Sequence, residues 1–238
     1  MQNAKAERGS LPKVSAVLLN YARPYHLAPI VRSLDRHEFI DEILIWDNSD
    51  DGLCPDSMAG TRADISYFAW KENVGTLGRW YAASHAQNET IYTQDDDVIV
   101  NRVPELLERF QSHRSKITAG LAPRHFLLEA ERKKEPWIQI GWGSLHLKSW
   151  LDCIATWIEI FGVDDLLKSK FDRIYTTLFG NHDPVCFREH VDFERLRGPD
   201  GRDSDRDSSA LWKQPDHYQK RDEAVRMALT LRREACPL

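Results

Sequence analysis

The sequence predicts an α/β protein with one largely parallel sheet flanked by helices, and three observations support this. Apolar stretches of strand length alternate with stretches of helical periodicity along the first half of the chain. Polar residues collect directly after the expected strands, where α/β sheets bind their ligands. The 238 residues are 42% hydrophobic and 29% charged, which suits a single globular domain with a substantial core.

The expected strands of this half are short apolar runs that end in turn-forming or polar residues. They are 13–21 (KVSAVLLNY), 42–46 (EILIW), 63–70 (ADISYFAW) and 90–94 (TIYTQ). Between them, Leu27, Ile30, Val31 and Leu34 recur at the spacing of one helical face. Residues 73–87 read as a glycine-containing loop that enters a helix, and 103–113 as an amphipathic helix.

The alternation weakens after about Ala122. Residues 124–137 form a charged connection, and the stretch WIQIGWGSLHLKSWL suggests strand, Gly-Trp-Gly turn and strand, followed by a helix over 149–161. Residues 198–209 are rich in Gly, Asp and Ser and predict a mobile loop, and 216–234 predict a closing helix. We therefore expect a flexible N-terminus at 1–12, a nucleotide-binding half at 13–122 and an acceptor-binding half at 123–238.

Three consecutive aspartates, Asp95 to Asp97, follow the run TIYTQ. Adjacent carboxylates repel one another, so a cluster at the end of a buried strand favours a hard divalent cation, Mn²⁺ or Mg²⁺, bound through oxygen. Such an ion takes one or two protein carboxylates and completes its shell with substrate phosphates. The alternative is a solvated acidic turn, and the position directly after a buried strand favours the metal.

Other residues fit a nucleotide diphosphate. Arg23 and Arg79 lie near expected strand ends or helix starts and are candidates for phosphate pairing, although an isolated Arg is more often a solvated surface charge. Asn48 and Asn73 are candidates for hydrogen bonds to base or ribose. The loop NVGTLG matches no established phosphate-binding pattern.

Composition narrows the class of partner. The 32 Lys and Arg residues against 37 Asp and Glu give no global basic field for nucleic acid. No apolar run reaches membrane-spanning length and the N-terminus has no signal-peptide core, so we expect a soluble, cytoplasmic protein, or a luminal one if an export segment has been trimmed. The four cysteines form no CxxC pair, which argues against a zinc knuckle. No interface signature indicates an oligomeric state.

The chain resembles GT-A glycosyltransferases, and within them the exostosin-like hexosaminyltransferases. The resemblance is carried, in order, by the segments NYARPYHL, ILIWDN, YTQDDDVIV, GLAPRHF, GWGSLHLKSWL, FGNHDPVCF and SSALWKQPDHYQKRDEAVRMAL. The last keeps the W-x4-H-x3-R spacing through Trp212, His217 and Arg221. Seven segments in the correct order are far more specific than a DXD motif alone.

The resemblance implies a role for each matching residue. Asp97 would ligate Mn²⁺ and bridge to the diphosphate, while Asp95 and Asp96 would contact the ribose or sugar and support the metal. The uridine and diphosphate would be held by Arg23, Asn48, Asn73 and Arg79. Asp183 would lie near the anomeric centre and acceptor, Arg221 on the leaving diphosphate, and residues 198–209 over the donor.

Two departures from the family matter. The family has two adjacent acids where this chain has Asp183 followed by Pro184, which bears on acceptor recognition. The stretch from Asn73 to Arg79 needs a gap to align, which makes the assignment of Arg79 the less secure. The animal enzymes of the family work in the secretory pathway behind a membrane anchor, and none is visible in this sequence, so we expect related chemistry and not heparan-sulfate synthesis itself.

The expected reaction moves a sugar, N-acetylhexosamine by resemblance, from a UDP-sugar to a hydroxyl acceptor with retention. An inverting transferase with Asp183 as general base is the alternative within the enzyme class. Asp183 in NHDP is also a plausible turn residue. A non-catalytic nucleotide-sugar or carbohydrate-binding protein remains open, whereas a nucleotidyltransferase is disfavoured because no glycine-rich loop follows the first strand.

Aromatic and histidine side chains add one candidate. Among Trp137, Trp142, Trp150 and Trp157, most are expected in the core, and Trp142 between two glycines is the best candidate for stacking on the acceptor. His182 and His217 are left out of the metal site, since no histidine pair has metalloprotease spacing.

Overall fold

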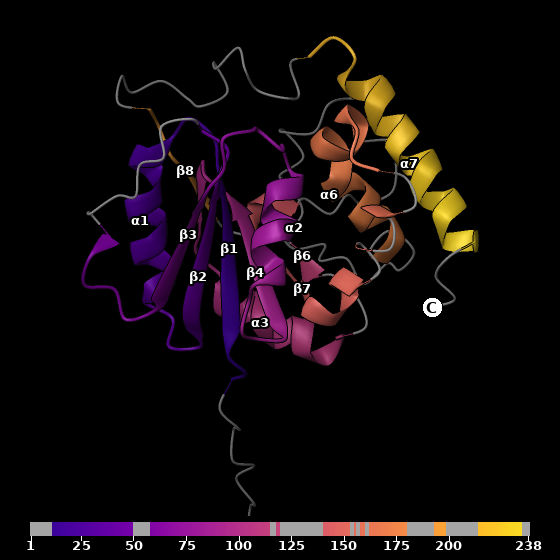
Figure 1. Ribbon diagram of the computed structural model, residues 1–238. Coiled ribbons are helices and arrows are strands. Elements are labelled where there is room, and N and C mark those ends of the chain that lie inside the picture. Colours follow the sequence, from indigo (N-terminus) through magenta and orange to yellow (C-terminus); the bar gives the residue numbers. More distant parts are fainter. Residues whose placement is uncertain are drawn as a thin grey trace, which may run out of the picture.

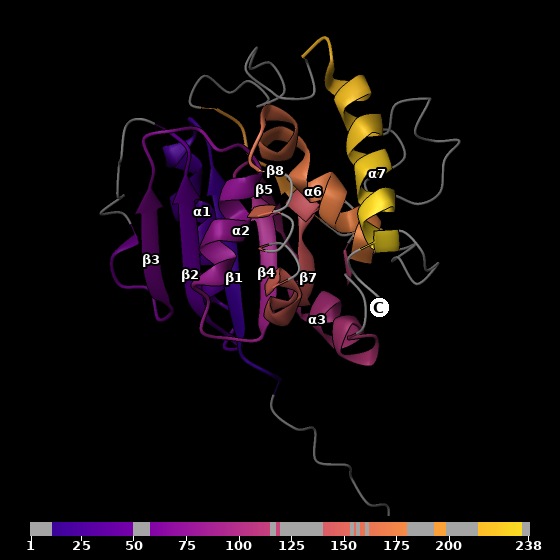
Figure 2. The ribbon, with the colours of Figure 1, turned by 45° about the vertical axis from the view of Figure 1, so that its right-hand side comes forward.

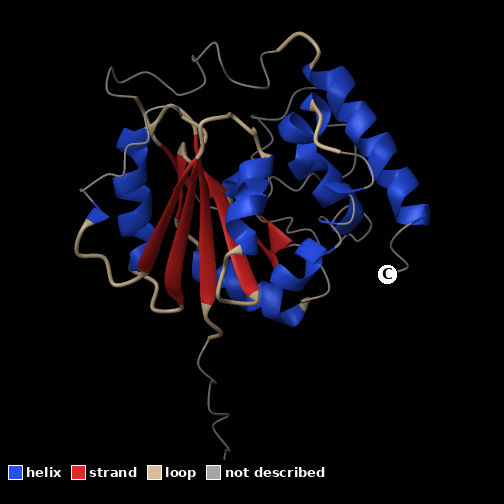
Figure 3. Cartoon of the chain, viewed as in Figure 1, coloured by secondary structure: helices blue, strands red, loops and turns tan. Residues whose placement is uncertain are grey.

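The computed structural model describes residues 11–49, 58–114, 118–119, 140–152, 155, 158–159, 162–179, 193–198 and 214–234. Its strands lie between helices on both sides (Figure 3). In chain order the elements are β1 (Val14–Asn20), α1 (Pro24–Asp35), β2 (Ile40–Asp47), β3 (Asp64–Ala69), α2 (Leu77–Ser84), β4 (Thr90–Asp95), β5 (Val98–Val100), α3 (Val103–Ser112), β6 (Thr118–Ala119), the 3₁₀ helix η3 (Ile140–Trp142), β7 (Ser144–Leu147), the 3₁₀ helix η4 (Lys148–Trp150), α6 (Asp165–Phe179), β8 (Phe193–Arg195) and α7 (His217–Glu234).

The main sheet is mixed but largely parallel. Its strand order is β3-β2-β1-β4-β7-β6, and a second sheet pairs β5 with β8 (Figure 1). Strands β1 to β4 are parallel, whereas β7 runs antiparallel to both β4 and β6. The register places Asn20 opposite Asp47 and Leu19 opposite Asp95, so the polar ends of three strands meet at one edge, as the sequence predicted.

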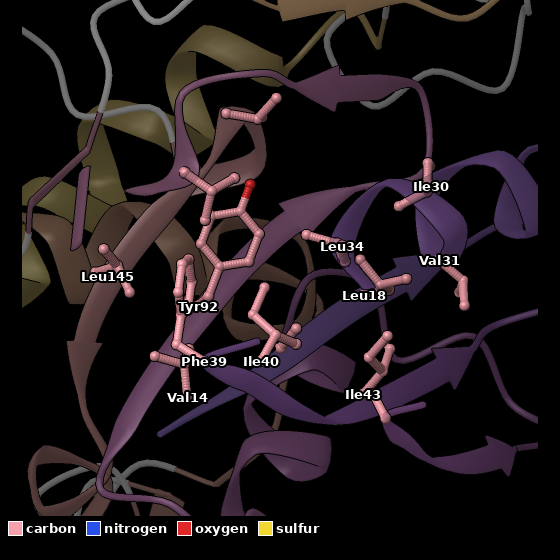
Figure 4. Close-up of a cluster of buried hydrophobic side chains, with 14 of the residues drawn as sticks. Val14, Leu18, Ile30, Val31, Leu34, Phe39, Ile40, Ile43, Tyr92 and Leu145 are labelled. Carbon is pink, nitrogen blue, oxygen red and sulfur yellow. The ribbon is translucent and has the colours of Figure 1, made fainter. Parts of the chain in front are cut away.

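Two apolar layers cover the sheet. On one face, α1 and α3 pack on strand side chains such as Leu18, Ile43 and Tyr92 (Figure 4). On the other face, α2 and α6 pack on Val17, Leu44 and their neighbours, and α7 packs on α6. The alternation of strand side chains sends consecutive residues to opposite faces, so β1, β2 and β4 contribute apolar side chains to both layers, whereas β3 is a partly exposed edge strand. Because helices cover both faces of the sheet, polar side chains and ligands can gather only at the ends of its strands.

The expected strands and helices of the first half are confirmed within a few residues, and so is the closing helix. The expected Gly-Trp-Gly turn contains the 3₁₀ helix η3, and the strand expected after it is confirmed as β7, whereas of the strand expected before it only Ile140 lies in the described residues. The charged connection 124–137 and the loop 199–209 lie outside the described residues. Among the helices of the described ranges, none combines the length and the apolar character needed to cross a bilayer.

His146 on β7 is a buried histidine of the core. It is fully buried next to the rings of Trp80 and Tyr175, whose centroids lie 5.1 and 5.4 Å away, and the Tyr175 hydroxyl is 3.1 Å from Nδ1. Burial lowers the pKa of His146 to about 3, helped by the nearby charge of Arg79 against a hydrogen bond to the Leu147 carbonyl. The native ring therefore stays neutral where an unfolded histidine, with a pKa near 6.5, takes up a proton.

We expect His146→Phe to flatten the pH dependence of stability. Between pH 6.5 and about 3 the unfolded state binds a proton that the native state does not, so His146 makes stability fall on acidification by about 1.4 kcal/mol per pH unit. Urea unfolding of wild type and variant between pH 7 and 4 measures the difference in slope. The same substitution at the exposed His113 is the control, and a slope in His146→Phe equal to that of wild type contradicts the account.

Candidate functional site

The three aspartates form a tight turn at the end of β4. Asp95 is the last residue of the strand, Asp96 and Asp97 make the turn, and β5 begins at Val98. The central carboxylate of Asp96 is buried, whereas Asp95 and Asp97 are partly exposed. The triad therefore presents its two outer carboxylates at the sheet edge and turns the middle one inward.

Asp96 ties this turn to the turn after β1. The backbone amide of Tyr21 donates to its Oδ2 at 2.8 Å, and Arg23 Nη1 donates to Oδ1 at 2.7 Å. Burial raises the pKa of Asp96 to about 7, Arg23 and the Tyr21 amide oppose that rise, and the charges of Asp97 and Asp95 add to it. Arg23 is thus the cationic partner of the Asp96 carboxylate.

The backbone between these two contacts is strained. Ala22 has φ +58°, which places it in the left-handed region that residues with a Cβ seldom occupy. The turn is held by the contacts on either side of it, from Tyr21 and from Arg23. Strain of this kind concentrates at functional sites, which agrees with the location of the turn beside the acidic triad.

Asp95 is held by a fully buried arginine. Arg79 of α2 is 1% exposed and donates from Nη2 to Asp95 Oδ1 at 2.5 Å. Its Nε lies 3.2 Å from Asp172 Oδ1 on α6, and the indole of Trp80 donates to the same oxygen at 3.0 Å. Burial raises the pKa of Asp172 to about 6 against the lowering effect of Arg79. The guanidinium therefore fixes Asp95 between α2, β4 and α6.

The 3₁₀ helix η3 passes close to Asp95. A Cβ added at Gly141 would overlap the Asp95 carboxylate, so glycine is required for this approach. The neighbouring Trp142 is half-buried, and the guanidinium of Arg195 lies 5.8 Å from its ring centroid, a cation–π arrangement. Trp142, the expected acceptor-stacking residue, thus lies close to the acidic turn, and the guanidinium of Arg195 lies over its ring.

Polar groups at the ends of β1 and β2 form a second network. Asp47 is buried and accepts hydrogen bonds from Asn20 Nδ2 and the Ser49 amide, both at 2.8 Å, and from the Tyr67 hydroxyl. Asn48 accepts from the Trp46 indole and the Val74 amide, both at 3.1 Å, and donates to the Gly75 carbonyl at 2.9 Å. The buried side-chain amide of Asn48 therefore joins the end of β2 to the loop before α2.

Asn73 lies in that loop and is exposed, with its Oδ1 accepting from the Gly75 amide at 2.8 Å. This side-chain-to-backbone bond closes a local turn. Gly75 has φ +59° and a Cβ there would meet the Lys168 carbonyl, so the loop passes close to α6. Asn48 and Asn73 thus both bond to the backbone of Gly75.

Arg221 belongs to a separate group of cations where α7 lies beside α6 (Figures 1 and 2). The buried Lys170 of α6 donates from Nζ to His217 Nδ1 at 3.1 Å. Burial, then the charges of Lys220 and Arg221, lower the pKa of Lys170 to about 8 against the effect of Asp216. This group gathers positive charge at the N-terminal end of α7, which favours anions.

The structure brings most of the predicted donor-site residues to one edge. Arg23, Arg79 and the acidic triad are linked by direct contacts. Asp183, His182, Trp137 and Trp157 lie outside the described residues. Sequence reasoning missed Asp172, which is part of an amphipathic helix with no motif, and it missed His26, whose contacts are set out below.

Asp95 and Asp97 are the residues of the acidic turn that could hold a divalent metal. Within the described residues no group of three or more His, Cys, Asp or Glu is arranged as a metal site. Asp95 and Asp97 nevertheless supply two partly exposed carboxylates at the sheet edge, the number that Mg²⁺ or Mn²⁺ takes from a protein when phosphates complete the shell. Asp96 is turned inward and paired, so it is poorly placed to join them.

Comparison with known proteins shows the fold. No family model and no curated protein matches the chain. Among solved structures it is similar to S. aureus TarS, with a TM-score of 0.50 and 16% identity over 69% of this chain and 33% of that one. It is also similar to the mannosyltransferase PcManGT from Pyrobaculum calidifontis in complex with GDP-Man and Mn²⁺, with a TM-score of 0.51 and 13% identity over 70% of this chain and 52% of that one. The chain thus matches a third to a half of these proteins' length and has a GT-A-like α/β fold.

We expect Asp172→Asn to destabilise the protein strongly. The substitution leaves the buried Arg79 guanidinium with Asp95 as its single carboxylate partner among the described residues, and breaking a buried ion pair costs about 3 kcal/mol or more. Urea unfolding at pH 8, where Asp172 is ionised, measures the loss. Asp165→Asn, at the exposed start of the same helix, is the control with an expected loss of about 1 kcal/mol or less. Equal losses in the two variants contradict the proposed role of Asp172.

Proposed function

We propose that the protein is a metal-dependent glycosyltransferase that moves a sugar from a nucleotide-sugar donor to a hydroxyl acceptor. The observation that carries this is the acidic turn: two partly exposed carboxylates, Asp95 and Asp97, at the carboxyl edge of a GT-A-like sheet. Ligands of open α/β sheets bind at that edge. The carboxylates give the edge an affinity for a hard cation and, through it, for a diphosphate.

Asp97 and Asp95 would hold Mn²⁺ or Mg²⁺ in this proposal. The metal, when bound, stabilises the negative charge that develops on the leaving diphosphate. Arg79 keeps Asp95 at the sheet edge through the 2.5 Å bond, and its own charge reduces repulsion between the outer carboxylates. That PcManGT, which shares the fold, was crystallised with GDP-Man and Mn²⁺ supports a donor of this class and a divalent metal.

The donor is proposed to be a UDP-sugar. Arg23 and Asn73, which keep some exposure, are the proposed direct contacts to base, ribose and diphosphate, and the first half of the chain, 13–122, supplies both. The buried Asn48 and Arg79 would support this edge through their hydrogen bonds to protein groups. Asp96, bonded to Arg23, would act on the donor through that arginine.

The acceptor side is proposed for residues 123–238. By the resemblance to exostosin-like hexosaminyltransferases, Asp183 orients acceptor or donor and Arg221 stabilises the leaving diphosphate. The positive charges of Lys170, Lys220 and Arg221 support an anion-binding role for α7. Trp142, next to Gly141 and Asp95, is the proposed acceptor-stacking residue. The resemblance also favours N-acetylhexosamine and retention, with an inverting mechanism through Asp183 as the alternative.

A non-catalytic nucleotide-sugar-binding protein is the second candidate from another class. The partly exposed outer carboxylates and the buried Arg79 support an intact donor site in either case. Turnover separates the two, because a binding protein takes up the donor with its metal but releases no diphosphate.

We expect release of nucleoside diphosphate from one donor in a panel of UDP- and GDP-sugars. The reaction should require Mn²⁺ or Mg²⁺, and EDTA should lower the rate by about 100-fold or more, since metal stabilisation of the leaving group is worth several kcal/mol. Coupled detection of free UDP or GDP, with and without added hydroxyl acceptors, measures it. NMR of the product's anomeric carbon then assigns retention or inversion. Donor binding without diphosphate release favours the binding protein, and no donor binding at all contradicts both.

A further inference from the structure

His26 in the first turns of α1 connects two segments that are far apart in the chain. Its side chain is 3% exposed. Ring Nδ1 lies 2.8 Å from the backbone carbonyl of Asp96, and Nε2 lies 3.0 Å from the backbone carbonyl of Arg197. One imidazole thus bridges the acidic turn and the residue that follows Leu196 beyond β8.

Both acceptors of His26 are carbonyl oxygens, which cannot donate a hydrogen bond. A ring nitrogen therefore stabilises its contact only where it carries the hydrogen that the carbonyl accepts. The contact to the Asp96 carbonyl is buried, so a donor lost there is not replaced by water, and the loss is larger than the net gain from an ordinary exposed bond. The arrangement consequently favours a fixed distance between the Asp96 and Arg197 backbones.

Two further contacts hold the same segment to the acidic turn. The Leu196 amide donates to the Asp97 carbonyl at 2.9 Å. Strand β8 pairs antiparallel with β5, with Arg195 opposite Val98 directly after the triad. Arg195 also lies over the ring of Trp142. The segment 193–197 therefore links the acidic turn with the side of the protein that carries the proposed acceptor residue.

We propose that His26 is a positioning residue that locks the Asp96–Asp97 turn to residues 193–197 and so aligns the metal-binding carboxylates with the acceptor side. The inference rests on the proposed function. The ring itself touches backbone carbonyls only, so its effect on the reaction is indirect. Misalignment of bound groups lowers turnover more than affinity, because the reacting atoms must meet at a defined distance.

Replacing His26 with glycine and adding a free base back tests the role of both ring nitrogens. We expect His26→Gly to lower kcat by about 10- to 100-fold with a much smaller change in the KM for the donor. Imidazole, which carries one more N–H than 1-methylimidazole in either protonation state, should restore kcat. 1-Methylimidazole, in which a methyl group replaces the hydrogen of one nitrogen, should not restore it. Equal rescue by the two bases, or a kcat unchanged in the variant, overturns the proposal.

A second measurement does not depend on catalysis. Exchange of the Leu196 amide hydrogen, which is bonded to the Asp97 carbonyl, should become about tenfold faster in His26→Gly and slow again with imidazole but not with 1-methylimidazole. His37→Gly, at the other end of α1, should leave this amide unchanged and is the matched control. An unaffected Leu196 amide in His26→Gly overturns the proposal. Absence of transfer in the wild type would instead sink the proposed function, while the exchange result would still decide whether His26 locks the two segments.

Discussion

The ion group that the buried Arg79 forms with Asp95 and Asp172 is the interaction on which the candidate site depends. A guanidinium with 1% exposure is expensive to desolvate, and the two carboxylates from β4 and α6 offset that cost. Because its three members come from α2, β4 and α6, the group fixes the helix layer on one face of the sheet relative to the strand that ends in the acidic turn. The position of Asp95 is therefore set by the core and not by a loop.

The same electrostatics explains how three adjacent aspartates are tolerated. Arg79 pairs with Asp95, Arg23 pairs with Asp96, and the alternation of the chain turns the middle carboxylate inward. These two cationic partners reduce the repulsion within the turn before any metal binds. Asp95 and Asp97 stay partly exposed at the sheet edge, and these are the carboxylates proposed to hold the metal.

The sheet edge could be predicted from sequence, whereas the burial of its charges could not. Strand periodicity and the polar residues after each strand place Asp47 and Asp95 together, because parallel strands end at one edge. Arg79 looked as much like a surface charge as a ligand, since its partner Asp172 is 93 residues away and belongs to a helix without a motif. A turn was expected at Gly141 and Trp142, but its close approach to Asp95 could not be predicted, because the two segments are distant in the chain and share no motif.

Binding of Mn²⁺ followed by electron paramagnetic resonance, with and without UDP, tests the central claim most directly. If Asp97 and Asp95 supply part of a shell that a diphosphate completes, Mn²⁺ binds weakly alone and about 100-fold or more tightly with UDP, since phosphate oxygens fill the remaining positions. Asp97→Ala should abolish this coupling, and Asp64→Ala, at the opposite end of the sheet, should retain it. Mn²⁺ affinity that is the same with and without UDP, or coupling that survives Asp97→Ala, would contradict the account.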